Sequence, residues 1–196
     1  MAKLYFTYGA MNSGKTAALL QVAHNYEERK LHPIILKPSI DTKGENKVVS
    51  RLGIERDVDY IITPDYDIEA GIILLDIDAI IVDEAQFLTK EQVEQLYHIT
   101  KYYNIPVLCY GLRCDFQMNS FSGSTRLLEI ADEINELKTI CSCGLKATQN
   151  VRFVDGIPVF DGDQVLIDGE QKNITYDSVC GKCYYTLKGG KYWPTL

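Results

Sequence analysis

The chain has 196 residues, 46% of them hydrophobic and 24% charged, a composition typical of a globular protein that can bury a real core. Its net charge of −7 argues against a general nucleic-acid binder, because such proteins need a basic surface. No signal-peptide pattern opens the sequence, and no apolar run is long enough to span a bilayer. We therefore expect a cytoplasmic protein with no stable nucleic-acid or membrane partner.

The first motif in the chain fits the phosphate-loop pattern G-x-x-x-x-G-K-[ST]. It consists of Gly9, Ala10, Met11, Asn12, Ser13, Gly14, Lys15 and Thr16. An apolar run at residues 4–8 precedes it and helical spacing over residues 17–30 follows, so backbone N–H groups and a helix N-terminus can surround a polyphosphate. We expect ATP here, with Lys15 on the β- and γ-phosphates and Thr16 on Mg²⁺. A chance glycine turn is the alternative.

Strands and helices alternate over the next hundred residues. We predict strands at residues 33–37, 60–62, 79–82 and 106–111, and a polar loop at residues 38–51. We predict helices at residues 66–75, from a capping box at Thr89 and Gln92 to about residue 103, and at residues 124–134. This alternation predicts an α/β fold of the P-loop NTPase (RecA-like) kind, a doubly wound parallel sheet flanked by helices.

Two carboxylates follow the apolar run at residues 79–82. Asp83 at the end of a buried strand has the position of a Walker B carboxylate, which holds Mg²⁺ near the phosphate loop. Glu84 follows it, and we expect this residue to act as the general base. An acidic strand end without a catalytic role is the alternative.

The residue pattern changes near residue 140: helical spacing ends, and short β-like runs follow at residues 151–154 and 157–160. We expect an ATP-binding domain at residues 1–140 and a small zinc-ribbon-like β module at residues 141–196. Its cysteines form two close pairs, with 36 residues between the pairs: Cys141, Cys143, Cys180 and Cys183. Thiolates at these spacings converge well on a tetrahedral structural Zn²⁺. Reduced structural cysteines and a redox pair remain as alternatives.

Together these motifs resemble the type II thymidine kinases, the zinc-containing class, and look closest to bacterial and bacteriophage members. The resemblance rests on Met11 in the phosphate loop, on Asp41, and on residues 83–87, 110–116, 137–144 and 176–183. It runs in order from residue 4 to about residue 185.

The resemblance implies transfer of the ATP γ-phosphoryl group to the 5′-OH of thymidine, giving dTMP, with Glu84 as the base and Asp41 near the sugar and Mg²⁺. It implies a thymine pocket lined by Met11, Phe87, Leu112, Phe116 and Phe121 and closed by Tyr176. A lasso loop would recognise the base edge through its backbone; it comprises Gln164, Val165, Leu166, Ile167, Asp168 and Gly169. Such enzymes are usually homotetramers inhibited by dTTP in the same site.

Three positions depart from the family pattern. Lys43 stands where arginine is usual, Asp168 stands where glycine is usual, and residues 170–175 form a longer segment than usual. Two other functions share some of these motifs, namely another P-loop ATPase and a zinc-ribbon adapter that binds nucleotide and nucleic acid without chemistry. The short acidic chain and the electrically neutral stretch at residues 141–196 disfavour both.

Overall fold

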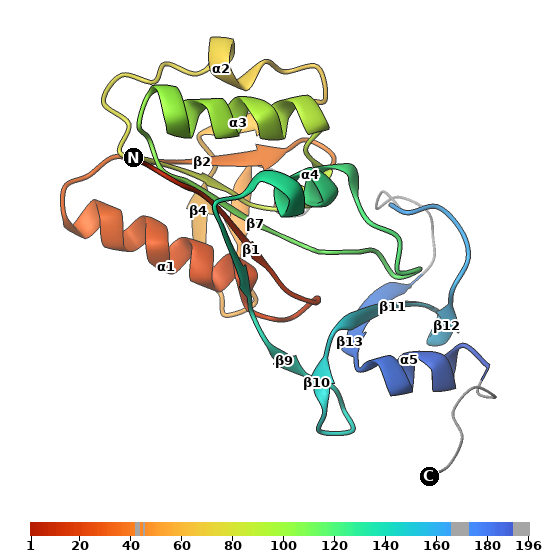
Figure 1. Cartoon of the computed structure of the whole chain (residues 1–196). Helices are drawn as coiled ribbons and strands as arrows, with labels where there is room; N and C mark the ends of the chain where they lie inside the picture. Colours follow the sequence, from red (N-terminus) through yellow and green to blue (C-terminus); the bar gives the residue numbers. More distant parts are fainter. Residues whose placement is uncertain (42–43, 45, 166–172, 190–196) are drawn as a thin grey trace.

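The fold is built on a six-stranded sheet in which every neighbouring pair is parallel (Figure 1). A computed structural model describes residues 1–41, 44, 46–165 and 173–189. The strand order is β5-β2-β6-β7-β1-β8. The strands are β1 (Leu4–Tyr8), β2 (Pro33–Pro38), β5 (Tyr60–Ile62), β6 (Ala79–Val82), β7 (Val107–Gly111) and β8 (Glu133–Glu136). β2 and β6 are buried along their whole length, as central strands covered on both faces must be.

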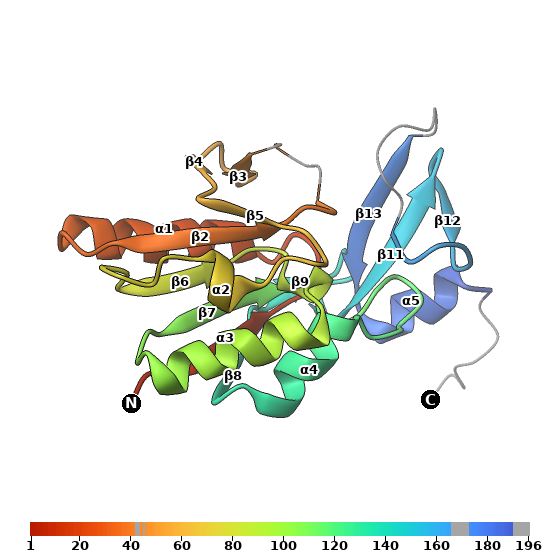
Figure 2. The same cartoon turned by 90° about the horizontal axis from the view of Figure 1, so that it is seen from above.

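Helices cover both faces of this sheet, which confirms the predicted α/β fold (Figure 2). On one face α1 (Lys15–Glu28) packs through Leu19 and Ala23 against Ile35 and Ile81. The other face is covered by α2 (Ile68–Gly71), α3 (Lys90–Tyr102) and α4 (Ser122–Ile130). The capping box predicted for α3 is present at its N-terminus. The parallel strands therefore end at one common edge, where α/β proteins bind ligands.

The remaining strands form smaller sheets outside this core. β9 (Thr139–Ile140) and β10 (Lys146–Ala147) pair with each other, and β11 (Gln149–Val154) lies between β12 (Ile157–Val159) and β13 (Ile174–Val179) in an antiparallel sheet. A short helix, α5 (Gly181–Leu187), packs under this sheet through Tyr184. The Tyr184 hydroxyl donates a hydrogen bond to the Phe116 carbonyl oxygen at 2.8 Å, and this bond fastens the small sheet to the loop after β7.

Three sequence predictions need correction. The predicted loop at residues 38–51 contains β3 (Lys47–Val49), which forms a hairpin with β4 (Glu55–Asp57). The helix predicted at residues 66–75 is only the single turn α2. The helix predicted to reach residue 134 ends at Ile130, because the chain then enters β8, an edge strand that pairs only with β1 among the described residues and is mostly exposed. A short 3-10 turn, η1 (Ala85–Phe87), follows β6.

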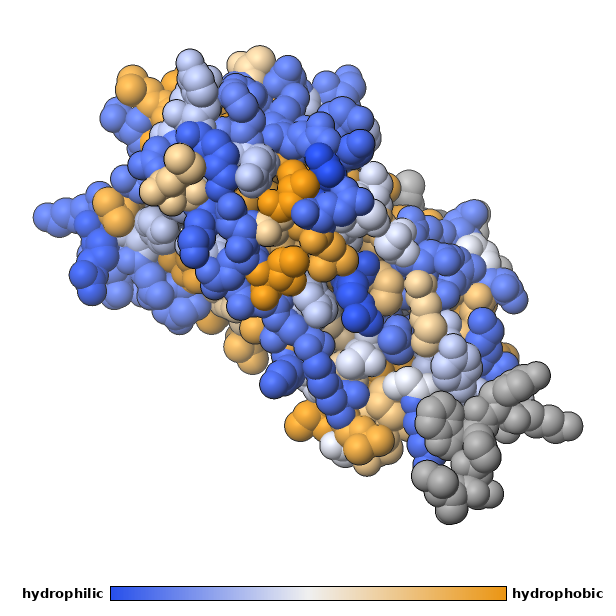
Figure 3. All heavy atoms as spheres, in the orientation of Figure 1, coloured by the Kyte–Doolittle hydropathy of each residue, from blue (hydrophilic) through white to orange (hydrophobic). Residues whose placement is uncertain are grey.

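The surface of the face shown in Figure 1 is mainly hydrophilic, with apolar side chains near its middle (Figure 3). Most large apolar side chains lie inside instead, in one core on each face of the main sheet and a third between the small sheet and α5. No helix in the described part of the chain is long and apolar enough to cross a membrane.

Candidate active site

The phosphate loop occupies the turn between β1 and α1. Two of its residues adopt left-handed backbone conformations, Asn12 with φ 63° and Gly14, the N-cap of α1, with φ 83°. Close packing requires a glycine at position 9, since a Cβ there would lie 2.3 Å from Ser13 Oγ and 2.7 Å from the Leu137 carbonyl oxygen. No side chain caps α1, so its first N–H groups can serve an anion at this turn.

Lys15 lies buried beneath the loop. Its Nζ donates hydrogen bonds to the carbonyl oxygens of Gly9 at 3.2 Å and Ala10 at 2.9 Å. Burial lowers the pKa of Lys15, and the Glu84 carboxylate partly opposes that effect. Ser13 Oγ is buried without a hydrogen-bond partner among the described residues. A buried ammonium group and an unsatisfied hydroxyl are both groups that a phosphate would engage.

Three carboxylates influence one another electrostatically where β6 ends. Asp83 and Glu84 follow the strand directly, and Asp41 comes from the loop after β2, 3.1 Å from Lys37 Nζ. Asp83 is only 5% exposed, and burial raises its pKa to about 7, with a further rise from the charges of Glu84 and Asp41. Clustered carboxylates that repel one another can be relieved by a divalent cation with a preference for oxygen ligands.

Gln86 holds Glu84 in place, a role that the motif at residues 83–87 did not predict. This side chain is 2% exposed. Its Nε2 donates to Glu84 Oε2 at 2.5 Å, and its Oε1 accepts a hydrogen bond from the Leu112 N–H at 3.0 Å. Glu84 itself has φ 47°, in the left-handed region that most residues avoid. The carboxylate is thus fixed by its own backbone conformation and by a bridge to the end of β7.

Two cavities meet at this edge of the sheet. The larger, of about 530 Å³, extends toward the small sheet, and the smaller, of about 270 Å³, lies over the phosphate loop. The residues that line both are Met11, Arg51, Glu84 and Leu112. Glu84 therefore stands at the border between a phosphate-binding space and a space of the size that a small ligand fills.

The structure places most of the predicted site residues that it describes around the two cavities, although Gly9 and Ala10 line neither of them. Those that line the larger cavity are Met11, Asp41, Phe87, Leu112, Phe116, Phe121, Gln164, Val165 and Tyr176. Residues 11–16 of the phosphate loop line the smaller one, whereas Asp83 lines neither and lies buried beside Glu84. Lys43, Leu166, Ile167, Asp168 and Gly169 fall outside the described residues.

Asn150 of β11 also lines the larger cavity, and the sequence did not predict this. Asn150 is buried, its Oδ1 accepts a hydrogen bond from the Met11 N–H at 2.8 Å, and its Nδ2 donates to the Cys114 carbonyl oxygen at 3.2 Å. The small sheet is thus joined directly to the phosphate loop. The signal in the sequence was a polar side chain at alternate positions of an otherwise apolar run, Asn150 and Arg152.

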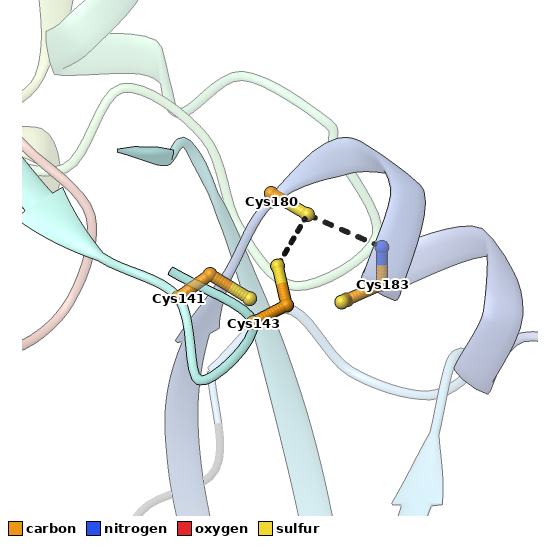
Figure 4. Close-up of side chains that lie close together, drawn as sticks. All are labelled: Cys141, Cys143, Cys180 and Cys183. Atoms are coloured by element: carbon orange, nitrogen blue, oxygen red, sulfur yellow. Dashed lines mark hydrogen bonds between the residues drawn. The ribbon is translucent and has the colours of Figure 1, made fainter. Parts of the chain in front are cut away.

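The four predicted metal-binding cysteines form one cluster (Figure 4). Cys141 and Cys143 come from the turn after β9, and Cys180 and Cys183 from the start of α5. Their sulfur atoms all lie within 4.8 Å of one another, and the Cys143 and Cys180 sulfurs are 3.6 Å apart. Tetrahedral zinc with Zn–S bonds of about 2.3 Å places its sulfurs about 3.8 Å apart. The cluster therefore fits a zinc ion.

The phosphate loop, the carboxylates at the next strand end and the parallel sheet define an α/β nucleotide-binding protein of the phosphate-loop class. The protein-family model described as thymidine kinase matches residues 2–184. The thymidine kinase of Enterobacteria phage T4 is 49% identical over 196 residues, covering 95% of this chain and 97% of its own. The thymidine kinase of Idiomarina loihiensis is 47% identical over 194 residues, covering 96% of this chain and 99% of its own. The thymidine kinase of Shewanella oneidensis is 49% identical over 187 residues, covering 93% of this chain and 96% of its own.

The chain belongs to the thymidine kinase family. It is accordingly a kinase that uses ATP, and the recognition made from the sequence motifs is confirmed.

Proposed function

We propose that this chain transfers the γ-phosphoryl group of ATP to the 5′-OH of thymidine, giving dTMP. The observation that carries the proposal is the border between the two cavities, where Glu84 and Met11 face both the phosphate loop and the larger cavity. Phosphoryl transfer requires the two substrates to meet in line at one point. The shared lining provides such a point.

On the donor side, we assign the phosphates to residues 9–16, with Lys15 neutralising charge on the β- and γ-phosphates. The oxygen atoms of Thr16, Asp83 and Asp41 would supply ligands of the kind that suits Mg²⁺. The mutual repulsion of the carboxylates supports this fit, because a divalent cation would stabilise their ionised forms. When bound, Mg²⁺ would neutralise charge on the transferring group.

On the acceptor side, we assign Glu84 as the general base that accepts the proton of the 5′-OH. Its hydrogen bond from Gln86 orients the carboxylate at the cavity border. A positioned base of this type contributes a factor of about 10²–10⁴ to the rate.

We assign thymine to the apolar part of the larger cavity. Phe116 and Phe121 would supply flat walls, and backbone groups of residues 164–169 would pair with the base edge. Deoxycytidine reverses the donor and acceptor at N3 and the exocyclic group, and it would leave buried groups unpaired, at a cost of up to about 10⁴-fold. We infer that dTTP binds in the same cavity as a competitive inhibitor.

We further propose that Zn²⁺ bound by the cysteine cluster is structural and stabilises residues 141–196 as a module distinct from residues 1–140. We also propose that the chain assembles as a homotetramer. The apolar core beneath the small sheet includes Cys141 and Cys180 themselves, which supports a metal that stabilises this module. Size-exclusion chromatography with light scattering would test the assembly.

A panel of nucleosides incubated with Mg²⁺ and ATP, followed by product chromatography, tests the proposed reaction. We expect dTMP from thymidine, and little product from deoxycytidine or purine nucleosides. ATP hydrolysis stimulated by DNA and indifferent to thymidine would instead support a P-loop ATPase and would overturn the proposal.

A further inference from the structure

Arg152 is an unusual residue for the middle of a small sheet. It lies on β11, is 1% exposed, and is among the largest fully buried side chains of the described residues. No carboxylate pairs with it within the part of the chain that the structure describes. Burying a charged group is costly unless other groups compensate it, so its contacts need an explanation.

The guanidinium group of Arg152 contacts three separate segments of the chain. Nε donates to the Tyr176 hydroxyl at 2.8 Å, on β13. Nη1 and Nη2 donate to the carbonyl oxygens of Asp163 at 2.8 Å and Gln164 at 3.1 Å. The central carbon lies 3.7 Å from the centre of the Phe116 ring, in the loop after β7, and 5.4 Å from the centre of the Tyr176 ring.

Three of the four contacted residues share one property, which Asp163 lacks. Phe116, Gln164 and Tyr176 all line the larger cavity, whereas Arg152 is not among its lining residues. Arg152 therefore lies behind three parts of the cavity wall that are far apart in sequence. Any effect of this side chain on a ligand must act through those walls.

Only arginine has the geometry for this role. Its planar guanidinium offers five donors in a fixed fork and a flat face that stacks on an aromatic ring. Lysine would keep the charge but could neither stack in the same way nor reach three acceptors in fixed directions. The combination of ring face and donor fork sets the separation between Phe116 and Tyr176 and fixes the backbone of residues 163–164.

A buried carboxylate, that of Asp115, also holds the segment of residues 163–164, through the side chain of Gln164. Asp115 is 3% exposed, and its Oδ2 accepts a hydrogen bond from Gln164 Nε2 at 2.9 Å. Its Oδ1 accepts from the N–H groups of Gln117 and Asn119, both at 2.8 Å. Gln164 is thus held by its side chain toward the loop after β7 and by its carbonyl group toward β11.

We propose that Arg152 is a positioning residue for the nucleoside, which fixes three walls of the acceptor cavity without contacting the ligand. The inference rests on the proposed function, since it takes the larger cavity as the nucleoside site. Thymidine affinity then depends on Arg152, while the phosphate site, formed by another part of the chain, does not.

The test compares Arg152→Lys with the wild-type protein and with Arg29→Lys, which makes the same change at the exposed C-cap of α1. For Arg152→Lys we expect the KM and Kd of thymidine to rise by about tenfold or more, which corresponds to about 1.4 kcal/mol. We expect the KM of ATP and kcat at saturation to change by less than about threefold, because uniform nucleoside binding is what is lost. Zinc content and circular dichroism serve as checks of folding. If Arg152→Lys does not fold, Arg152→Gln, which leaves no buried charge, takes its place.

A double-mutant cycle with Tyr176→Phe separates positioning from simple loss of structure. Because the Tyr176 hydroxyl accepts from Arg152, its removal should weaken thymidine binding in the wild type and have less than about half that effect beside Arg152→Lys. Additive effects, or an unchanged thymidine Kd in Arg152→Lys, would overturn the inference.

Thymidine binding measured by calorimetry tests the role of Arg152 separately from the proposed reaction. A wild-type protein that binds thymidine but makes no dTMP would contradict the reaction alone, and the Arg152 comparison would still be decided by Kd. A wild-type protein that binds no nucleoside would overturn both.

Discussion

Replacing Gln86 by leucine should lower both the Tm and kcat, and the two effects can be estimated separately from its two hydrogen bonds. The substitution keeps the volume but removes the acceptor of the buried Leu112 N–H and the donor to Glu84. An unsatisfied buried N–H costs about 1–3 kcal/mol, whereas the half-buried Glu84 can turn to water at lower cost. A loss of about 2 kcal/mol in a chain of this length corresponds to a fall in Tm of about 4–8 °C. Release of Glu84 should also lower kcat by about tenfold or more, a part of what a positioned base contributes.

The matched control is Gln95→Leu. Gln95 on α3 also accepts a hydrogen bond from a backbone N–H, that of Ile68 at 3.0 Å, but it does not line either cavity. Differential scanning calorimetry and steady-state kinetics should show a fall in Tm in both variants, smaller in Gln95→Leu because its hydrogen bond is only part-buried, with kcat reduced only in Gln86→Leu. Equal kcat values in the two variants would show that Gln86 does not position Glu84.

Glu84→Gln should leave ATP binding and Tm nearly unchanged while kcat falls by about 10²–10⁴-fold; a variant with more than about half of the wild-type activity would exclude Glu84 as the base. Elemental analysis of protein purified without chelator should find one zinc per chain, and Cys183→Ser should lose it together with thymidine binding; zinc-free wild-type protein would refute the site. Burial raises the pKa of Asp83 from 3.8 to about 7 in the folded protein. The protonated Asp83 carboxyl therefore contributes fully to the stability of the folded state below pH 3.8, and this contribution is lost as the pH rises through about 7. In EDTA, Asp83→Asn should therefore flatten the fall of Tm with pH across that window, and identical slopes in the two proteins would contradict this.

Much of the main sheet could be predicted because its signals are local. An apolar run followed by a glycine turn and a helical pattern determined β1, the phosphate loop and α1, and the four buried residues of β6 located Asp83 and Glu84. β8 was missed because its sequence is polar and its only described neighbour, β1, lies more than a hundred residues earlier. The hairpin of β3 and β4 was missed for a similar reason, since three-residue strands carry little periodicity.

The site residues that were missed are those whose partners lie far along the chain. The hydrogen bond between Asn150 and Met11 joins positions 139 residues apart, and no spacing rule relates them. Gln86 bridges two strand ends, and Arg152 reaches the loop after β7. Each appears in the sequence only as a polar residue near a strand, and nothing in its local sequence identifies its partner.

The two cavities are lined by different parts of the chain, and this affects how the preference for an acceptor nucleoside can change. The smaller cavity is lined entirely by residues 11–112, whereas the larger one also draws Asn150, Gln164 and Tyr176 from the part after residue 140. Chimeras that exchange this part between relatives should therefore alter the choice of nucleoside, to which Phe116 and Phe121 of the first part also contribute, while leaving the phosphate donor unchanged. Every such chimera would need an asparagine at position 150, because its side chain joins the exchanged part to the phosphate loop through the Met11 amide.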